Sequence, residues 1–116
     1  MSHHDDLIRL RHMLDHAREA RELIRGKVRS DLDSHRLLEL SLVRLMEIIG
    51  ESANRVSSAC QSRYPHIPWA QIISLRHRLI HGYDSVDMDI LWEILTKDLP
   101  VLIVELEKIM FSEAGS

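Results

Sequence analysis

The stretch from residue 31 to residue 57 constrains the fold most, because its apolar side chains surround most of a helix. A helix that is apolar on most of its circumference is buried on most of it. A chain of 116 residues can hardly cover every side of such a helix, so we expect a homodimer interface along it. The apolar positions are Leu37, Leu38, Leu40, Leu42, Val43, Leu45, Met46, Ile48 and Ile49.

Three other segments carry apolar residues at helical spacing, over residues 6–25, 69–81 and 87–110. Pro68 precedes the middle segment and suits the first turn of a helix. Pro100 lies inside the last segment, where it removes a backbone donor and should kink or split the helix. The sequence therefore predicts four long helices with short connections.

Composition favours the same fold class. The chain has 4 Gly and 3 Pro, too few for the tight turns of a many-stranded sheet. Only 4% of the residues are aromatic, so the core must be aliphatic. We predict a single all-α domain over residues 1–116, a bundle of four long helices whose last helix is kinked or split near Pro100.

Charge and cysteine usage limit the partners and the compartment. The net charge of −3 argues against a protein that coats nucleic acid through bulk positive charge, although a local basic pocket is compatible with it. Cys60 is the one cysteine, so no intrachain disulfide can form and a reducing compartment fits. The polar opening of the chain and the short apolar run over residues 99–104 predict a cytoplasmic protein without a membrane span.

The segment from Arg76 to Tyr83 concentrates the residue types that phosphodiester cleavage needs. A guanidinium such as that of Arg76 or Arg78 can hold a phosphate through paired hydrogen bonds. An imidazole such as that of His77 or His81 can move protons near neutral pH. No metal is required when the nucleophile is the 2′-hydroxyl of the RNA itself.

Helical geometry alone leaves the arrangement of these residues open. Residues five apart lie about 140° from each other on a regular helix, so Arg76 and His81 would not share a face. Arg76 and Tyr83, seven apart, would share one. Gly82 makes a distorted terminus that re-aims His81 plausible, and a two-fold dimer can also bring one copy's histidine near the other copy's arginine.

Other interpretations compete with this one. His12 and His16 lie four residues apart, as two zinc ligands on one helix face would, but no third ligand follows and we interpret them as surface residues. Cys60 is interpreted as a small packing residue rather than a nucleophile. The arginines can equally well pair with the acidic residues that follow the segment, which are Asp84, Asp87 and Asp89.

Short motifs follow one another in order along nearly the whole chain. They are Asp6-Leu7-Ile8-Arg9-Leu10, Ile48-Ile49-Gly50-Glu51-Ser52-Ala53, Ile67-Pro68-Trp69, Arg76-x4-His81-x-Tyr83, Val86-Asp87, Trp92 and Leu99-Pro100. This succession resembles the HepT-like members of the HEPN family.

The resemblance implies a HEPN helical bundle that forms a homodimer, with the Arg-x4-His-x-Tyr motif lining a cleft at the dimer interface. It also implies a metal-independent endoribonuclease toxin that uses no cofactor and is encoded beside a nucleotidyltransferase antitoxin, the MNT partner. By the same resemblance, Arg76 would hold the scissile phosphate and His81 would be the acid–base catalyst. Tyr83 would receive AMP from the partner, which silences the toxin, and would also be available to contact RNA.

Three neighbours of the motif complete the expected site. His77 stands where the family often has asparagine, and Arg78 adds a second cation. Glu51 belongs to the family's glutamate-bearing segment, but the sequence assigns it no role. The alternative to an enzyme is a non-catalytic HEPN dimer that binds a nucleotide or a nucleotidyltransferase partner.

Overall fold

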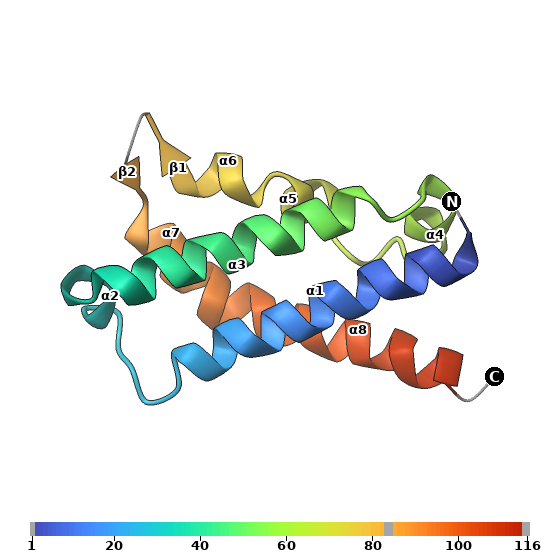
Figure 1. The fold of residues 1–116 in the computed structure, drawn as a ribbon, viewed down its shortest axis with the longest axis horizontal. Helices are drawn as coiled ribbons and strands as arrows, with labels where there is room; N and C mark the ends of the chain where they lie inside the picture. The colour runs from blue at the N-terminus through green and yellow to red at the C-terminus, as the bar shows by residue number, and fades with distance from the viewer. Residues whose placement is uncertain (1, 83–84, 115–116) are drawn as a thin grey trace.

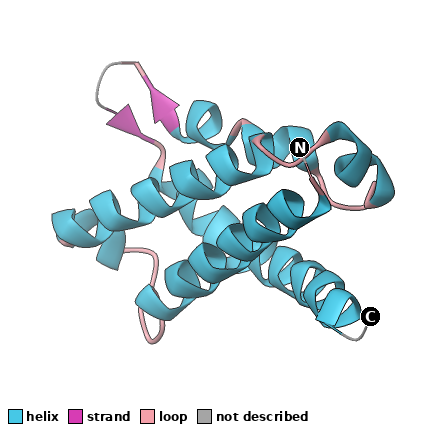
Figure 2. Ribbon diagram, turned by 45° about the vertical axis from the view of Figure 1, so that its right-hand side comes forward, coloured by secondary structure: helices cyan, strands magenta, loops and turns pink. Residues whose placement is uncertain are grey.

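The computed structural model describes residues 2–82 and 85–114, and it is almost entirely helical (Figures 1 and 2). The prediction of an all-α bundle is confirmed. The elements are α1 (His3–Leu23), α2 (Asp31–Ser34), α3 (Arg36–Asn54), α4 (Ser58–Arg63), α5 (Trp69–Ile73), α6 (Leu75–Leu79), β1 (Ile80–His81), β2 (Ser85–Val86), α7 (Met88–Glu93), the π-helical turn η1 (Ile94–Asp98) and α8 (Leu99–Ala114).

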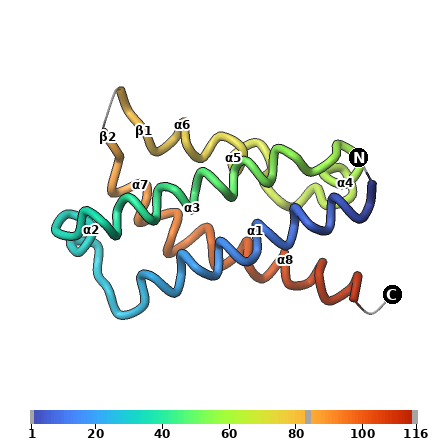
Figure 3. The backbone as a smooth tube through the Cα atoms, in the orientation of Figure 1, coloured from blue at the N-terminus to red at the C-terminus, as the bar shows by residue number. Residues whose placement is uncertain are grey.

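The three long helices α1, α3 and α8 form the body of the molecule (Figures 1 and 3). Helix α1 packs against both α3 and α8, while α5 and α6 pack on α3. The short antiparallel pair of β1 and β2 lies at one end, next to α6 and α7, and both termini lie at the other end. No helix within the described residues is long and apolar enough to cross a membrane.

Helix α1 begins at His3, three residues before the start that the sequence predicted at residue 6. Ser2 caps it by accepting a hydrogen bond from the amide of Asp5, and the Asp5 carboxylate accepts one from the Ser2 amide in return. The backbone amide of Ser2, followed by its hydroxyl, stabilises the Asp5 carboxylate and holds the pKa of Asp5 below its usual value. Buried Asp6 accepts hydrogen bonds from the amide (2.8 Å) and the hydroxyl (2.7 Å) of Ser57, which joins the start of α1 to the start of α4.

The predicted helix over residues 31–57 is divided at His35, whose backbone leaves the helical region at φ −127° and ψ 86°. The His35 ring donates a hydrogen bond to the Asp31 carbonyl (2.9 Å). A continuous helix would use this carbonyl for the His35 amide, so the side chain competes with the helix. The long helix α3 starts only after this break and ends at Asn54.

The predicted helix over residues 69–81 is also divided, and it ends before His81. The Ser74 hydroxyl bonds back to the Ala70 carbonyl (2.9 Å), and Ser74 separates α5 from α6. Helix α6 stops at Leu79, after which His81 lies in β1 and Gly82 takes φ +68°. Glycine adopts such an angle without the steric cost that other residues bear. The helical-wheel angle between Arg76 and His81 therefore does not apply.

The predicted kink or split near Pro100 is confirmed. The chain passes from α7 through η1 into α8, and the Leu99 amide bonds to the Ile94 carbonyl five residues earlier. The next bond of this kind would join the Pro100 nitrogen to the Leu95 carbonyl, but proline has no N–H to donate. Arg21 of α1 donates to that carbonyl instead (3.1 Å).

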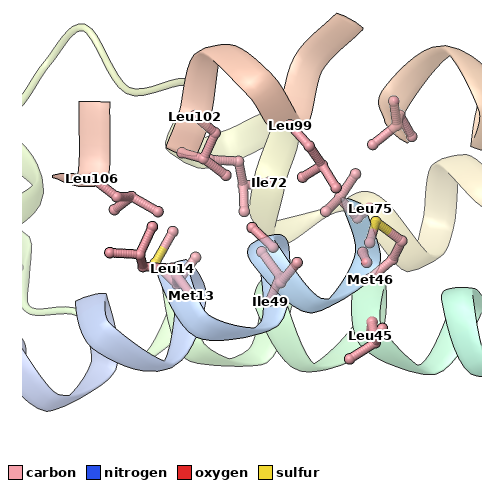
Figure 4. Packing of buried hydrophobic residues seen from close by; sticks show 14 of the residues in the cluster. Met13, Leu14, Leu45, Met46, Ile49, Ile72, Leu75, Leu99, Leu102 and Leu106 are labelled. Carbon is pink, nitrogen blue, oxygen red and sulfur yellow. The ribbon is translucent and has the colours of Figure 1, made fainter. Parts of the chain in front are cut away.

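The core lies between α1, α3, α5, α6 and α8, and it is aliphatic as predicted (Figure 4). Met13 of α1, Ile49 of α3 and Leu102 of α8 are among the side chains that converge there. Gly50 lets α3 approach α5 closely, because a Cβ at this position would lie 2.9 Å from the Ile72 carbonyl oxygen.

We predict that Gly50→Ala destabilises the protein by about 1–2 kcal/mol, measured by denaturant unfolding. The clash with the α5 backbone costs about 1–3 kcal/mol, which exceeds the roughly 0.5–1 kcal/mol that alanine gains over glycine within a helix. An increase in the free energy of unfolding would show that helix propensity decides the effect, and it would contradict the proposed close contact.

Candidate active site

The short hairpin places His81 beside a carboxylate. His81 pairs with Ser85 across the two strands, and the Asp87 amide donates to the Leu79 carbonyl (2.8 Å). As a result, the His81 Nε2 atom lies 3.6 Å from the Asp87 Oδ2 atom. The other Asp87 oxygen caps α7 by accepting a hydrogen bond from the Ile90 amide (3.0 Å). The cap fixes the carboxylate, and the carboxylate can orient an imidazole whose side chain is 59% exposed.

Arg76 projects from α6 toward α3. Its Nε atom donates to the Glu47 carboxylate (3.1 Å), and its side chain is 68% exposed. A guanidinium has five N–H donors, so this contact leaves donors for a phosphate. Arg76 and Glu47 line a pocket of about 170 Å³ together with Gly50, Glu51, Asn54 and Ile73. Glu51 thus lies beside the same pocket as Arg76, and it also pairs with Arg44 (3.6 Å).

The remaining motif residues lie apart from this pocket or outside the described residues. Arg78 faces Asp98 (3.9 Å) and lines a different cavity of about 210 Å³, between α5–α6 and α8. His77 is exposed. Tyr83 lies outside the described residues. The local chemistry therefore consists of an exposed guanidinium on α6, an exposed imidazole on β1 and a carboxylate beside each.

Glu47 was not identified from the sequence, because the close approach of α3 and α5 that brings it to Arg76 is a tertiary feature. Its only signal in the sequence was Gly50 one turn later, a residue that permits such an approach.

The competing interpretation paired the arginines with later acidic residues. In the structure Asp87 contacts His81 instead, Asp89 contacts Arg29 (2.8 Å), and Asp84 lies outside the described residues.

The alternative chemical sites have ordinary structural roles. The His16 ring donates to the His12 carbonyl (2.6 Å) within α1, and no cluster of three potential ligands for a metal occurs in the described part of the chain. Cys60 is buried in the core at 3% exposure, and burial, followed by the nearby Asp6 charge, raises the pKa of its thiol. A raised thiol pKa disfavours the nucleophilic thiolate.

Comparison with known proteins identifies relatives along most of the chain. The family model described as "Ribonuclease HepT-like" matches residues 13–109. No solved structure matches the chain.

Three curated proteins illustrate this similarity. A "Probable ribonuclease HepT" of Thermococcus cleftensis is 32% identical over 83% of this chain and 91% of its own length. A "Putative RNase" of Methanocaldococcus jannaschii is 28% identical over 92% of this chain and 98% of its own length. A "Gamma-glutamylcyclotransferase and putative RNase" of the same organism is 34% identical over 91% of this chain, which spans about half (48%) of that relative.

We predict that Arg76→Ala and His81→Ala each change the free energy of unfolding by less than about 1 kcal/mol, because exposed ion pairs contribute little to stability. Denaturant unfolding of the two variants beside the wild type measures this. A loss of several kcal/mol would assign both residues a structural role and contradict the geometry of an accessible site.

Proposed function

This chain belongs to the HepT-like ribonuclease family, and we propose that it is a metal-independent endoribonuclease, the toxin of a HEPN/MNT toxin–antitoxin pair. The observation that carries the proposal is the local arrangement around the Arg-x4-His-x-Tyr motif. An exposed arginine with free donors and an exposed histidine whose Nε2 atom lies 3.6 Å from a capped carboxylate stand five residues apart in the sequence, on either side of a helix end.

In the proposed reaction His81 accepts the proton of the RNA 2′-hydroxyl. The 2′-oxygen forms a bond to the adjacent phosphorus, and the bond from phosphorus to the 5′-oxygen breaks. The 5′-oxygen leaves and is protonated to a hydroxyl, while the other fragment retains a 2′,3′-cyclic phosphate. Arg76 stabilises the negative charge on the phosphoryl oxygens, and Asp87 holds the imidazole and stabilises its protonated form.

While Glu47 is paired with Arg76, its carboxylate competes with the RNA phosphate for the guanidinium. The ion pair is largely solvent-exposed on the arginine side, so a phosphate that brings bidentate acceptors can displace the carboxylate. Glu51, on the same pocket, adds a second negative charge. The site would therefore bind RNA weakly in a single copy, which is compatible with completion of the site by a second copy.

Helix α3 is the proposed dimer interface. Leu37 and Leu40 are 78% and 48% exposed, and they lie one turn apart on the same helix as Glu47. Burying these leucines against a second copy removes apolar surface from water. A two-fold axis beside α3 would also bring the two copies of the Arg76 pocket toward each other, in line with the cleft that the family resemblance implies.

Tyr83 is the proposed site of regulation. The partner nucleotidyltransferase would transfer AMP from ATP to the phenolic oxygen, with release of pyrophosphate. The added phosphate lies two residues from His81 in the sequence, where its negative charge and bulk repel the RNA backbone. The proposal therefore includes silencing by charge and steric exclusion, with nucleotide binding at the same position during transfer.

We predict that purified protein cleaves RNA in the presence of EDTA, and that His81→Ala and Arg76→Ala reduce the rate by about 10²–10⁴-fold. His12→Ala is the matched control, because it removes a histidine of α1 that makes no contact with the site. Gel analysis of labelled RNA measures the rates. Absence of cleavage by wild-type protein with unmodified Tyr83 would instead favour the non-catalytic, partner-binding dimer.

We also predict that Leu37→Ser combined with Leu40→Ser shifts the protein from dimer to monomer in analytical ultracentrifugation. The control is Val101→Ser combined with Val104→Ser, which removes two exposed apolar side chains at the same spacing from α8. If both double variants remain dimeric, or if only the α8 variant dissociates, the interface does not involve this face of α3.

A further inference from the structure

A broad groove lies on the side of the bundle where the end of α1 meets α7, η1 and α8. Its volume is about 680 Å³, within the roughly 300–1,000 Å³ range of pockets that hold small ligands. Helix α1 contacts both η1 and α8. The lining residues are Arg18, Arg21, Glu22, Ile24, Arg25, Gly26, Lys27, Trp92, Thr96, Pro100 and Ile103.

The groove is cationic although the chain is acidic overall. Four lining side chains are basic and one is acidic, whereas the whole chain has a net charge of −3. Arg18 is neutralised by Glu107 (2.6 Å), and Arg21 is committed to the Leu95 carbonyl. A neutral carbonyl leaves the charge of Arg21 in place, but Arg21 is partly buried, so the exposed cations that a ligand can contact are Arg25 and Lys27.

Arg25 and Lys27 are accessible to a bound anion. The Arg25 contact with Glu22 (3.3 Å) is between side chains that are 79% and 65% exposed, so water and salt screen it strongly. Lys27 is exposed, and the described residues include no ion-pair partner for it. Gly26, between them, has φ +73°, which turns the chain so that both basic residues border the groove.

The lining of the groove also includes apolar side chains and an indole. Trp92 of α7 is partly buried, and it lines the groove together with Pro100 and Ile103 of α8. An aromatic face beside basic side chains is how proteins bind single-stranded nucleic acid, with bases stacked on the ring and phosphates held by the cations. A purely acidic peptide would use the charges but would leave the indole without a stacking partner.

The groove is connected to the candidate site through α7. Asp87, at the N-terminus of this helix, contacts His81, and Trp92 follows five residues later, about 7.5 Å along the helix axis. Between them Asp89 pairs with Arg29, which fixes the loop that carries Lys27 against α7. Residues five apart on a helix point about 140° away from each other, so a strand of RNA at His81 would reach the groove by passing around α7.

We infer that this groove is a second contact site for the RNA strand, in which Trp92 stacks a base and Arg25 and Lys27 hold its phosphates. The inference rests on the proposed ribonuclease function, because RNA is the ligand only if it is the substrate. The groove adds affinity outside the reacting atoms, so it affects substrate binding and not the chemical step.

The test is a fluorescence titration of the full chain with a single-stranded RNA decamer that is 2′-O-methylated throughout and cannot be cleaved by 2′-hydroxyl attack. Trp69 is nearly buried, so a change in emission that disappears in Trp92→Phe reports on the groove. We expect Arg25→Gln combined with Lys27→Gln to weaken binding about tenfold in low salt. The slope of log affinity against log salt should fall by about 1.4.

The control is Arg55→Gln combined with Arg63→Gln, which changes the net charge equally at exposed positions near α4, at the other end of the molecule (Figure 1). Equal weakening by the two double variants would overturn the inference, since only overall charge would then matter. Binding of AMP as tight as that of the decamer would identify a free-nucleotide site instead. Binding of a polyglutamate decamer as tight as that of RNA would identify an acidic protein as the ligand.

Cleavage assays separate this inference from the proposed function. We expect Arg25→Gln with Lys27→Gln to raise the KM for unmodified RNA about tenfold with kcat unchanged, while His81→Ala lowers kcat and leaves decamer binding intact. Groove-dependent binding without any cleavage would contradict the ribonuclease proposal but support the groove. Cleavage with an unchanged KM in the double variant would support the ribonuclease and contradict the groove.

Discussion

The close contact of α3 with α5 at Gly50 is the constraint on which the candidate site depends. The absence of a side chain at this position lets the backbones meet, so that the α5–α6 segment lies directly on α3. Arg76 is thereby brought to Glu47, and the hairpin that follows α6 brings His81 to Asp87. A bulkier residue at position 50 would move the whole segment that carries the motif.

The helical conformation of the predicted segments and the interruption near Pro100 were predictable because they depend on local rules, but the four long helices expected are three long helices and several short ones in the structure. Apolar spacing indicates the buried faces of α1, α3 and α8, and proline cannot donate a backbone hydrogen bond wherever it lies. The breaks at His35 and Ser74 were not predicted. At His35 the ring bonds to the carbonyl that the helix would use, whereas at Ser74 the hydroxyl shares the Ala70 carbonyl with the Ser74 amide (3.2 Å). Bonds of this kind can bend or end a helix, and whether they do so depends on packing as well as sequence.

The site was predictable in residue types but not in geometry. Arg76 and His81 stand out in the sequence, yet their regular helical relation is lost because α6 ends at Leu79 and His81 belongs to a strand. Glu47 lies 29 residues before Arg76, and only the tertiary contact brings them together. The same holds for the basic groove, whose lining comes from the end of α1, the residues that follow it, α7, η1 and α8.

Local electrostatics reconcile an acidic chain with an anionic substrate. The groove beside the end of α1 has an excess of basic side chains, and such a local positive region attracts phosphates more than the net charge suggests. In the proposed reaction Asp87 would hold the His81 imidazole, while Glu47 would restrain binding at Arg76 until a phosphate displaces it. Affinity, chemistry and regulation by a modified tyrosine would then all depend on the charge within a small part of the surface.

The most direct test of the central claim is to change the nucleophile of the RNA rather than the protein. A short RNA with one cleavage position is compared with the same RNA carrying a single 2′-O-methyl group at the nucleotide before the scissile bond, in EDTA, with mass spectrometry of the product ends. Attack by the 2′-hydroxyl predicts a 2′,3′-cyclic phosphate and a 5′-hydroxyl from the first RNA and no cleavage of the second. Cleavage of the methylated RNA, or products with 5′-phosphate ends, would contradict the account.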